Sequence, residues 1–329
     1  SAETIVQVQT EHERFCRPGF YHSILKEICN IESCQVNYIG RPFCETDMPV
    51  LLMQDISILG MIKTPNSEEY VKPTGLTVKS LADWHRVMDW WFETYGTYAV
   101  AVKSQNAYSR NIDYDQVSAE NAEPIFKELL AGERLTDVKK KALEDHNFWY
   151  AVRKATECHL PVKLHTGYYA GQNINLPLWR LRDNGPAASD LCRKAPETDF
   201  IFMHINYPYY EELIALAKHY TNAHVDMCWA WLINPLAAKD FLKKYLVTAP
   251  ANKLLSFGGD YFTVEPIVGH AALARQGITL ALTELVEEGW ISQATALDLA
   301  EDIMRRNARR IFHLDEKERL LKHAPWSSR

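Results

Sequence analysis

The sequence contains no C-x-x-C pair, although it has 7 cysteines. The count is odd and the spacing is irregular, which argues against both a disulfide framework and a cysteine-based zinc site. The opening residues also lack the basic segment and apolar segment of a secretory signal. We therefore expect reduced thiols and a cytoplasmic location. The cysteines are Cys16, Cys29, Cys34, Cys44, Cys158, Cys192 and Cys228.

Long apolar runs and clusters of positive charge are also absent. No stretch approaches the roughly 18 consecutive apolar residues of a membrane span. The formal net charge is −6 and no run is rich in lysine and arginine, which argues against a nucleic-acid partner. We therefore expect neither membrane nor nucleic-acid binding, but a small-molecule substrate and a homo-oligomeric assembly.

Two nucleotide-binding motifs are missing as well, since no G-x-G-x-x-G follows an early strand and no P-loop occurs. What the chain does have, from about residue 30, is a regular alternation of short apolar runs and longer segments with helical spacing. Strands are expected at 33–40, 49–59, 97–104, 160–167, 199–205, 223–230 and 253–260. Helices are expected at 76–96, 118–130, 136–159, 209–220 and 235–246, and two more extend to about residue 313.

This alternation predicts a parallel sheet covered by helices. A doubly wound sheet is one possibility, but a (β/α)8 TIM-like barrel fits the number and spacing of the segments better, with the first strand missing from the given chain. We expect one domain over residues 1–329. Residues 1–30 are interpreted as an N-terminal extension or insertion, and residues 314–329 as a loose C-terminal tail.

Polar side chains stand at the ends of four apolar runs that would otherwise bury them: Lys103, His165, His204 and Asp260. Active sites of parallel α/β folds lie at the carboxyl ends of the strands. One such histidine is more often a core residue with a hydrogen-bond partner. Four of these residues together are costly to bury unless they pair or bind a metal. Two histidines and an aspartate suit Zn, Mn or Fe, and a metal-activated water can attack a carbonyl or phosphoryl centre.

The loops after these strands are rich in aromatic residues and carry arginine. Arg41 follows the strand expected at 33–40, Tyr108 follows that at 97–104, and Tyr168 follows that at 160–167. Trp229 stands at the end of the strand expected at 223–230. A pocket with aromatic walls and an arginine suits a small carboxylate that bears an apolar portion. Arg41 and Trp229 are the stronger candidates because they stand directly at strand ends.

The most specific part of the sequence is "HINYPYYEELIALAKHYTNAHVD" followed by "APANKLLSFGGD". These blocks resemble the amidohydrolase superfamily of metal-dependent barrel enzymes, and most closely its amidohydrolase 2 branch. That branch includes decarboxylases of aromatic acids, lactone hydrolases and the barrel domain of FluG-like proteins. The resemblance implies a barrel fold and a divalent metal, with zinc expected and manganese as the alternative.

The resemblance also implies roles for the residues at the strand ends. His165 would be a metal ligand, and Asp260 would be both a ligand and the proton acceptor. His204 would bind a second metal or polarise the substrate. Lys103 would either be carboxylated and bridge two metals or, as we favour, remain a plain lysine that binds a substrate anion.

The expected function is therefore metal-dependent hydrolysis of an amide, lactone or ester bond in a small carboxylated substrate. A decarboxylase and a non-catalytic barrel scaffold are the alternatives. One departure bears on this choice: the family's H-x-H pair on the first strand is absent, and His12 and His22 are single. Either the given chain begins after that strand, or the strand is lost. In the second case the barrel would be open, and the protein would be inactive or would complete its site from another chain.

Overall fold

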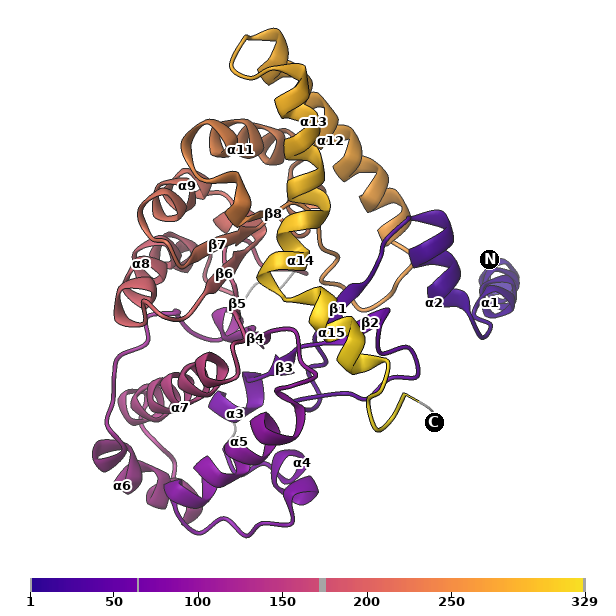
Figure 1. Ribbon diagram of the computed structural model, residues 1–329. Helices are drawn as coiled ribbons and strands as arrows, with labels where there is room; N and C mark the ends of the chain where they lie inside the picture. The colour runs from indigo at the N-terminus through magenta and orange to yellow at the C-terminus, as the bar shows by residue number, and fades with distance from the viewer. Residues whose placement is uncertain (1, 64, 172–175, 328–329) are drawn as a thin grey trace.

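The computed structural model describes residues 2–63, 65–171 and 176–327. All strand pairings are parallel, as the alternation predicts (Figure 1). Two strands, β1 (Cys34–Val36) and β2 (Leu52–Gln54), form a small sheet of their own. The other six form one sheet in chain order: β3 (Ile56–Ser57), β4 (Val102–Ser104), β5 (Val162–His165), β6 (Phe200–Met203), β7 (Ala223–Asp226) and β8 (Leu254–Leu255).

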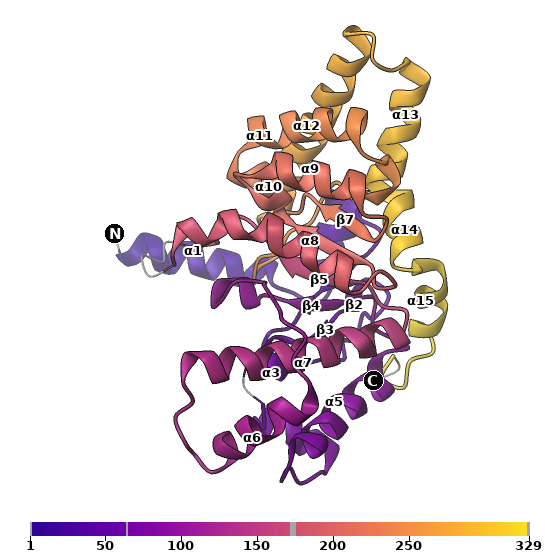
Figure 2. The same cartoon turned by 90° about the vertical axis from the view of Figure 1, so that its left-hand side faces the viewer.

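Helices follow the strands and cover the outside of this sheet. Figure 2 shows α7, α8 and α9 on the side of the molecule that faces the viewer, outside the strands. The helices between the strands are α3 (Leu59–Lys63), α4 (Glu68–Val71), α5 (Leu81–Tyr95), α6 (Ala119–Leu130), α7 (Asp137–Glu157), α8 (Asn184–Lys194), α9 (Tyr210–His219), α10 (Ala230–Ile233) and α11 (Pro235–Thr248). The C-terminal helices are α12 (Ile267–Glu287), α13 (Gln293–Glu301), α14 (Asn307–Ile311) and α15 (Leu314–Leu321).

The sequence determines where several of these helices begin and which face they bury. The hydroxyl of Ser118 accepts the backbone N–H of Asn121, and the hydroxyl of Thr136 accepts that of Lys139. These hydrogen bonds cap the first turns of α6 and α7, as serine and threonine commonly do. In α5, the i, i+3, i+4, i+7 spacing predicts a core-facing stripe. All four of its residues are at most 3% exposed: Trp84, Val87, Met88 and Trp91.

The N-terminal segment lies at the edge of the molecule, away from the sheet (Figure 1). It contains α1 (Ala2–Phe15), the short α2 (Phe20–His22) and a π-helical turn over Ser23–Ile28. Ile24 and Leu25 of that turn pack in a small buried cluster with Val264 and Ile267, which flank the start of α12. The segment is thus joined to the loop that follows β8.

Three expectations about segment bounds need correction. The run 49–59 is divided at Asp55 into β2 and β3, so the chain has eight strands rather than seven in its described part. The last strand is much shorter than 253–260, and Asp260 lies on the loop beyond β8 rather than at the strand end. The expected loose tail is wrong: residues 314–321 form α15, and Trp326 beyond it is only 5% exposed.

The C-terminal segment is ordered because its side chains make apolar contacts and hydrogen bonds with residues that precede β2 and β4. The indole of Trp326 packs against the rings of Phe43 and Tyr98. The ammonium of Lys317 donates to the carbonyl oxygens of Gly96 and Thr97, just before β4. The charged composition of residues 314–329 suggested exposure to solvent. Long charged side chains can nevertheless bury their aliphatic stems, so composition alone did not reveal these contacts. Among the described residues, no helix is both long and apolar enough to cross a membrane.

Candidate metal centre

Three of the predicted residues meet at one edge of the six-stranded sheet. His165 ends β5 and His204 directly follows β6. One ring nitrogen of each histidine and one carboxylate oxygen of Asp260 all lie within 4.8 Å of one another. The parallel register pairs His165 with Met203, so His204 follows one position beyond. The Nε2 atom of His204 is 3.2 Å from Oδ2 of Asp260. Adjacent parallel strands thus bring both imidazoles together, and the loop after β8 adds the carboxylate.

The backbone around this group is unusual. Three consecutive residues, His204, Ile205 and Asn206, have φ angles of 66°, 51° and 54°, and Asp260 has φ of 53°. Left-handed backbone is rare for residues other than glycine, and it clusters at functional sites. Gly167 makes room for this turn, because a Cβ there would lie 2.5 Å from the backbone nitrogen of Tyr207. The chain therefore bends sharply at the point where it presents His204.

Both imidazoles are buried and neutral. His165 is 1% exposed and His204 is fully buried. Burial, followed by the neighbouring His204 and then by the charge of Lys103, lowers the pKa of His165 well below its ordinary value. Burial lowers the pKa of His204 to about 4, although Asp260 opposes this shift. Neutral imidazoles keep a nitrogen lone pair, which is the form that binds metals.

The Asp260 carboxyl is anionic. Burial raises its pKa, but the Lys103 charge and the imidazole of His204 outweigh this effect and hold the pKa well below the ordinary value. Its side chain is 27% exposed, so the carboxylate faces the solvent-accessible side of the group. Trp229 donates its indole N–H to Oδ2 of Asp260 at 3.3 Å, and its ring centroid is 4.5 Å from that of His204.

These residues fit a divalent cation. In the described part of the chain, the Nδ1 atoms of His165 and His204 are buried and have no hydrogen-bond partner, and such orphaned atoms are rare in folded proteins. The Nε2–H of His165 donates to the carbonyl of Tyr168 at 3.1 Å, which leaves the lone pair on Nδ1 free for a metal. Two imidazoles and one carboxylate form a donor set like those of catalytic zinc sites, which keep a fourth position open.

The predicted substrate-binding residues divide into two groups. The first group lies at the three donors. Lys103 is 1% exposed, and its Nζ lies 4.0 Å from Oδ1 of Asp260 and against the sulfur of Met203. Trp229 belongs to the same group through its hydrogen bond to Asp260. The Tyr168 side chain is 39% exposed beside the ring of Tyr207. The guanidinium of Arg41 contacts Cys44 and Tyr38, and makes no hydrogen bond or ion pair to the three donors among the described residues. Its role in substrate binding stays a prediction.

Sequence reasoning placed Tyr108 only at the mouth, whereas its ring centroid lies 4.5 Å from that of His165. It missed Lys163 and Asp55, whose charged groups form a buried ion pair of 2.6 Å beneath the site. A signal for Lys163 was present, because alternate residues of a strand share a face and Lys163 precedes His165 by two. Its partner Asp55, far away in the sequence, carried no comparable signal.

A parallel α/β fold with two histidines and an aspartate at one sheet edge is the arrangement of metal-binding barrel enzymes. Residues 134–314 match the model of the amidohydrolase family, which covers more than half of the chain. The chain therefore belongs to the amidohydrolase family, as the blocks around His204 and Asp260 predicted.

The chain is also similar to individual proteins. It is 25% identical over 229 residues to protein fluG of Emericella nidulans, a match that covers 66% of this chain but only 26% of fluG. The chain thus spans about a quarter of the length of this relative. Among solved structures, it resembles a glucuronate isomerase from Caulobacter crescentus, with a TM-score of 0.73, 17% identity, and coverage of 91% of this chain and 67% of that one.

A proposed metal-dependent hydrolase from Lactobacillus casei is similar to the same degree. Its TM-score is 0.71 at 15% identity, and the match covers 92% of this chain and 78% of that one. At such low identities these likenesses establish the shared fold, and they confirm the expected barrel class. In the described part of this chain, the ladder of strands runs from β3 to β8 without a pairing that closes it.

Proposed function

We propose that this chain is a metal-dependent hydrolase that acts on an amide, lactone or ester bond of a small carboxylated substrate. The observation that supports this proposal most strongly is the group of His165, His204 and Asp260, with free nitrogen lone pairs on both imidazoles and an anionic carboxylate. We expect zinc, with manganese as the alternative.

His165, through Nδ1, together with His204 and Asp260 would hold the cation. When bound, a divalent cation supplies Lewis-acid polarisation of a carbonyl and lowers the pKa of water. Asp260 can accept a proton from an attacking water, because its pKa keeps it ionised at neutral pH. The Trp229 indole N–H fixes Oδ2 of that carboxylate, so the carboxylate remains oriented while it gains and passes on the proton.

Lys103 would bind the carboxylate of the substrate. Its ammonium is buried beside Asp260 and against the sulfur of Met203. An ammonium has three N–H donors, so it retains capacity for an anionic ligand. The rings of Tyr108 and Trp229 lie beside those of His165 and His204, and Tyr168 lies next to His165, whose imidazole donates to its carbonyl. Their rings would cover the apolar part of the substrate and exclude water from it.

A second candidate is isomerisation of a uronic acid. The similar structure from Caulobacter crescentus is a glucuronate isomerase, and a buried lysine next to a proton acceptor suits a carboxylated sugar as well as it suits a hydrolytic substrate. Decarboxylation of a related acid and a non-catalytic scaffold are the remaining alternatives. They differ in product and in metal content.

Metal analysis of the purified protein tests the proposal first. About one equivalent or more of zinc or manganese is expected, and His165→Ala should lose the equivalent bound at this site. His219→Ala, at an exposed histidine of α9, is the matched control and should keep it. A stably folded wild-type protein that takes up no metal would instead support the scaffold. Product analysis with carboxylated lactones and amides, and with D-glucuronate, then separates hydrolysis from isomerisation.

A further inference from the structure

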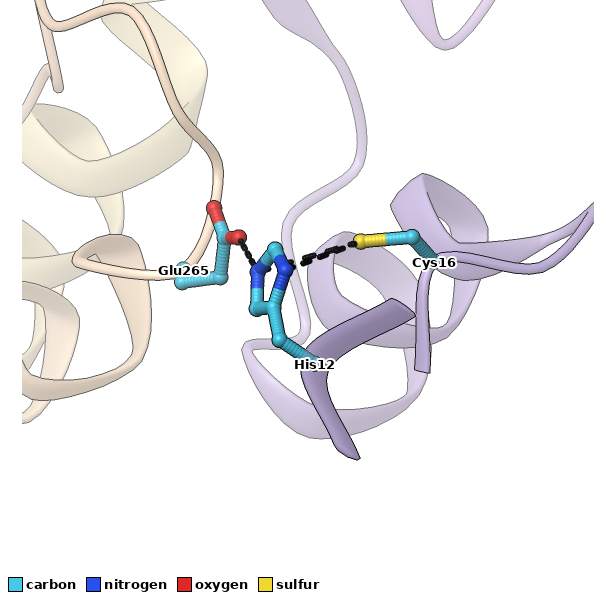
Figure 3. A group of neighbouring side chains, drawn as sticks. All are labelled: His12, Cys16 and Glu265. Carbon is cyan, nitrogen blue, oxygen red and sulfur yellow. Dashed lines mark hydrogen bonds and ion pairs between the residues drawn. The ribbon is translucent and has the colours of Figure 1, made fainter. Parts of the chain in front are cut away.

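A second group of metal-binding side chains lies on the surface, where the N-terminal segment meets the loop before α12. It consists of His12, Cys16 and Glu265 (Figure 3). Nε2 of His12 is 2.7 Å from Oε1 of Glu265, and the sulfur of Cys16 is 3.7 Å from Nδ1 and 3.8 Å from Nε2 of the same ring. One atom of each residue lies within 4.8 Å of the others.

The backbone sets this geometry. The N–H of Cys16 donates to the carbonyl of His12 at 3.1 Å, so the helical turn continues past the end of α1. Residues four apart on a helix lie on the same face, and the thiol therefore stands beside the imidazole. Glu265 comes from a sequence position 253 residues away. It is held there by Val264 and Ile267, which are buried against Ile24 and Leu25 of the N-terminal segment.

We propose that His12, Cys16 and Glu265 bind a zinc ion that fastens α1 to the loop following Asp260. A thiolate, an imidazole and a carboxylate are all established zinc ligands, and the exposed position leaves a fourth site for water. Tetrahedral zinc would place nitrogen and oxygen ligands about 3.3 Å apart, and nitrogen and sulfur about 3.5 Å apart. The present separations of 2.7 and 3.8 Å are within reach of small rotations of these exposed side chains.

The ordinary alternative is a hydrogen-bonded group without a metal, in which His12 pairs with Glu265 and the Cys16 thiol contacts the same imidazole. The contact with His12 lowers the pKa of the Glu265 carboxyl, so the carboxylate is anionic with or without a metal. The sulfur distinguishes the two possibilities, because it remains a thiol in a hydrogen-bonded group, whereas a metal would be bound by the thiolate.

Cobalt substitution tests the site separately from the candidate active site, which offers no thiol among its three donors. Wild-type protein titrated with Co²⁺ should develop a thiolate-to-cobalt charge-transfer band in the near ultraviolet. The band should persist in His165→Ala, and it should disappear in Cys16→Ser and in His12→Ala. Cys44→Ser and Cys228→Ser are the matched controls and should keep the band.

Zinc binding gives a second readout. Competition with a chromophoric chelator should show one equivalent of zinc fewer in Cys16→Ser than in Cys44→Ser, and at least tenfold weaker binding of that equivalent in Glu265→Gln. Circular dichroism checks that each variant folds, which is expected because His12 and Cys16 are exposed. A wild-type titration without the band, or a band that survives Cys16→Ser, would overturn the proposal.

Discussion

The Asp260 carboxylate is the residue on which the proposed chemistry depends most. It is anionic, oriented by Trp229, and in contact with His204. We expect Asp260→Asn to keep part of the metal, because the amide oxygen can still coordinate. The amide cannot accept a proton, so kcat should fall by at least ~10²-fold, the low end for loss of a general base. Steady-state kinetics together with metal analysis measures both effects.

Asp226 is the matched control for that variant. It ends β7, is 8% exposed, and accepts the backbone N–H of Cys228 at 2.8 Å. Burial, opposed by Lys163, raises the pKa of Asp226 to about 6. Asp226→Asn preserves the shape and the hydrogen-bond acceptor, so kcat should change several-fold at most. Normal turnover by Asp260→Asn would remove the basis for the proposed site.

Lys103 gives a second prediction for a single residue. We expect Lys103→Ala to keep its metal and to show a raised KM or a lowered kcat, because the ammonium would bind the substrate anion. A carboxylated lysine that bridges two metals predicts the opposite result. In that case the variant would lose metal, and added short-chain carboxylates would restore part of it. Metal content with and without added propionate decides between these two roles.

The sequence predicted His165, His204 and Asp260 because each ends or follows an apolar run, and parallel strands collect such residues at one edge. It could not predict that Arg41 would contact Cys44 and Tyr38, since the direction of a loop side chain depends on contacts from distant segments. The surface group of His12 and Glu265 was hidden for the same reason, because its members are far apart in the chain.

At the scale of secondary-structure elements, the buried ion pair between Lys163 and Asp55 joins β5 to the connection between β2 and β3. Lys163 also donates to the side chain of Gln35 in β1 at 3.0 Å, so it links the small sheet to the large one. Both charged side chains are at most 6% exposed. Lys163→Met would leave Asp55 buried without its partner, which typically costs about 3–5 kcal/mol of stability.

Urea unfolding measures this loss as a lower midpoint. The double variant Asp55→Leu/Lys163→Met is the control, because replacing a buried ion pair by apolar groups is often close to neutral. It should regain most of the lost stability. Equal stability of wild type and Lys163→Met would show that the ion pair contributes nothing to joining these elements.

The alternation of parallel strands with α5, α7 and α9 could be predicted from the sequence, and α7 has its expected cap at Thr136. The sequence did not predict α1, α3, α4 or α10. The short β8 could not be predicted, because Ser256–Asp260 continue the apolar and glycine-rich pattern of a strand while their backbone leaves the ladder. The sequence also could not predict that the C-terminal segment is well ordered. The residues of α15 are largely charged, and its attachment depends on the distant carbonyls of Gly96 and Thr97.

At the scale of the whole molecule, neutral histidines that are buried or half-buried predict a loss of stability in acid. Burial lowers the pKa of His270 to about 4, and burial followed by His146 does the same for His85. An unfolded histidine titrates near about 6.5. Between about pH 6.5 and 4 the unfolded chain therefore binds protons that the folded chain does not, so this stability is complete above pH 6.5 and declines toward pH 4.

Each such histidine changes the free energy of unfolding by up to about 1.4 kcal/mol per pH unit in that window. His270→Phe, at a site only 1% exposed and next to Phe257, should remove one of these contributions. Urea unfolding of the metal-free protein at several pH values measures the slope. A slope in His270→Phe as steep as that of the wild type would contradict the assignment.

The homo-oligomeric state stays a prediction, which light scattering can test.

The left-handed turn at His204, Ile205 and Asn206 also limits which substitutions this region can tolerate. Glycine at position 205 would relieve backbone strain of about 1–3 kcal/mol. However, Ile205 is fully buried, and truncating a buried isoleucine costs about 2–5 kcal/mol. No single replacement both relaxes the backbone and fills the space. We therefore expect a saturation mutagenesis screen to find few acceptable residues at this position, and selection for heat resistance to leave it unchanged.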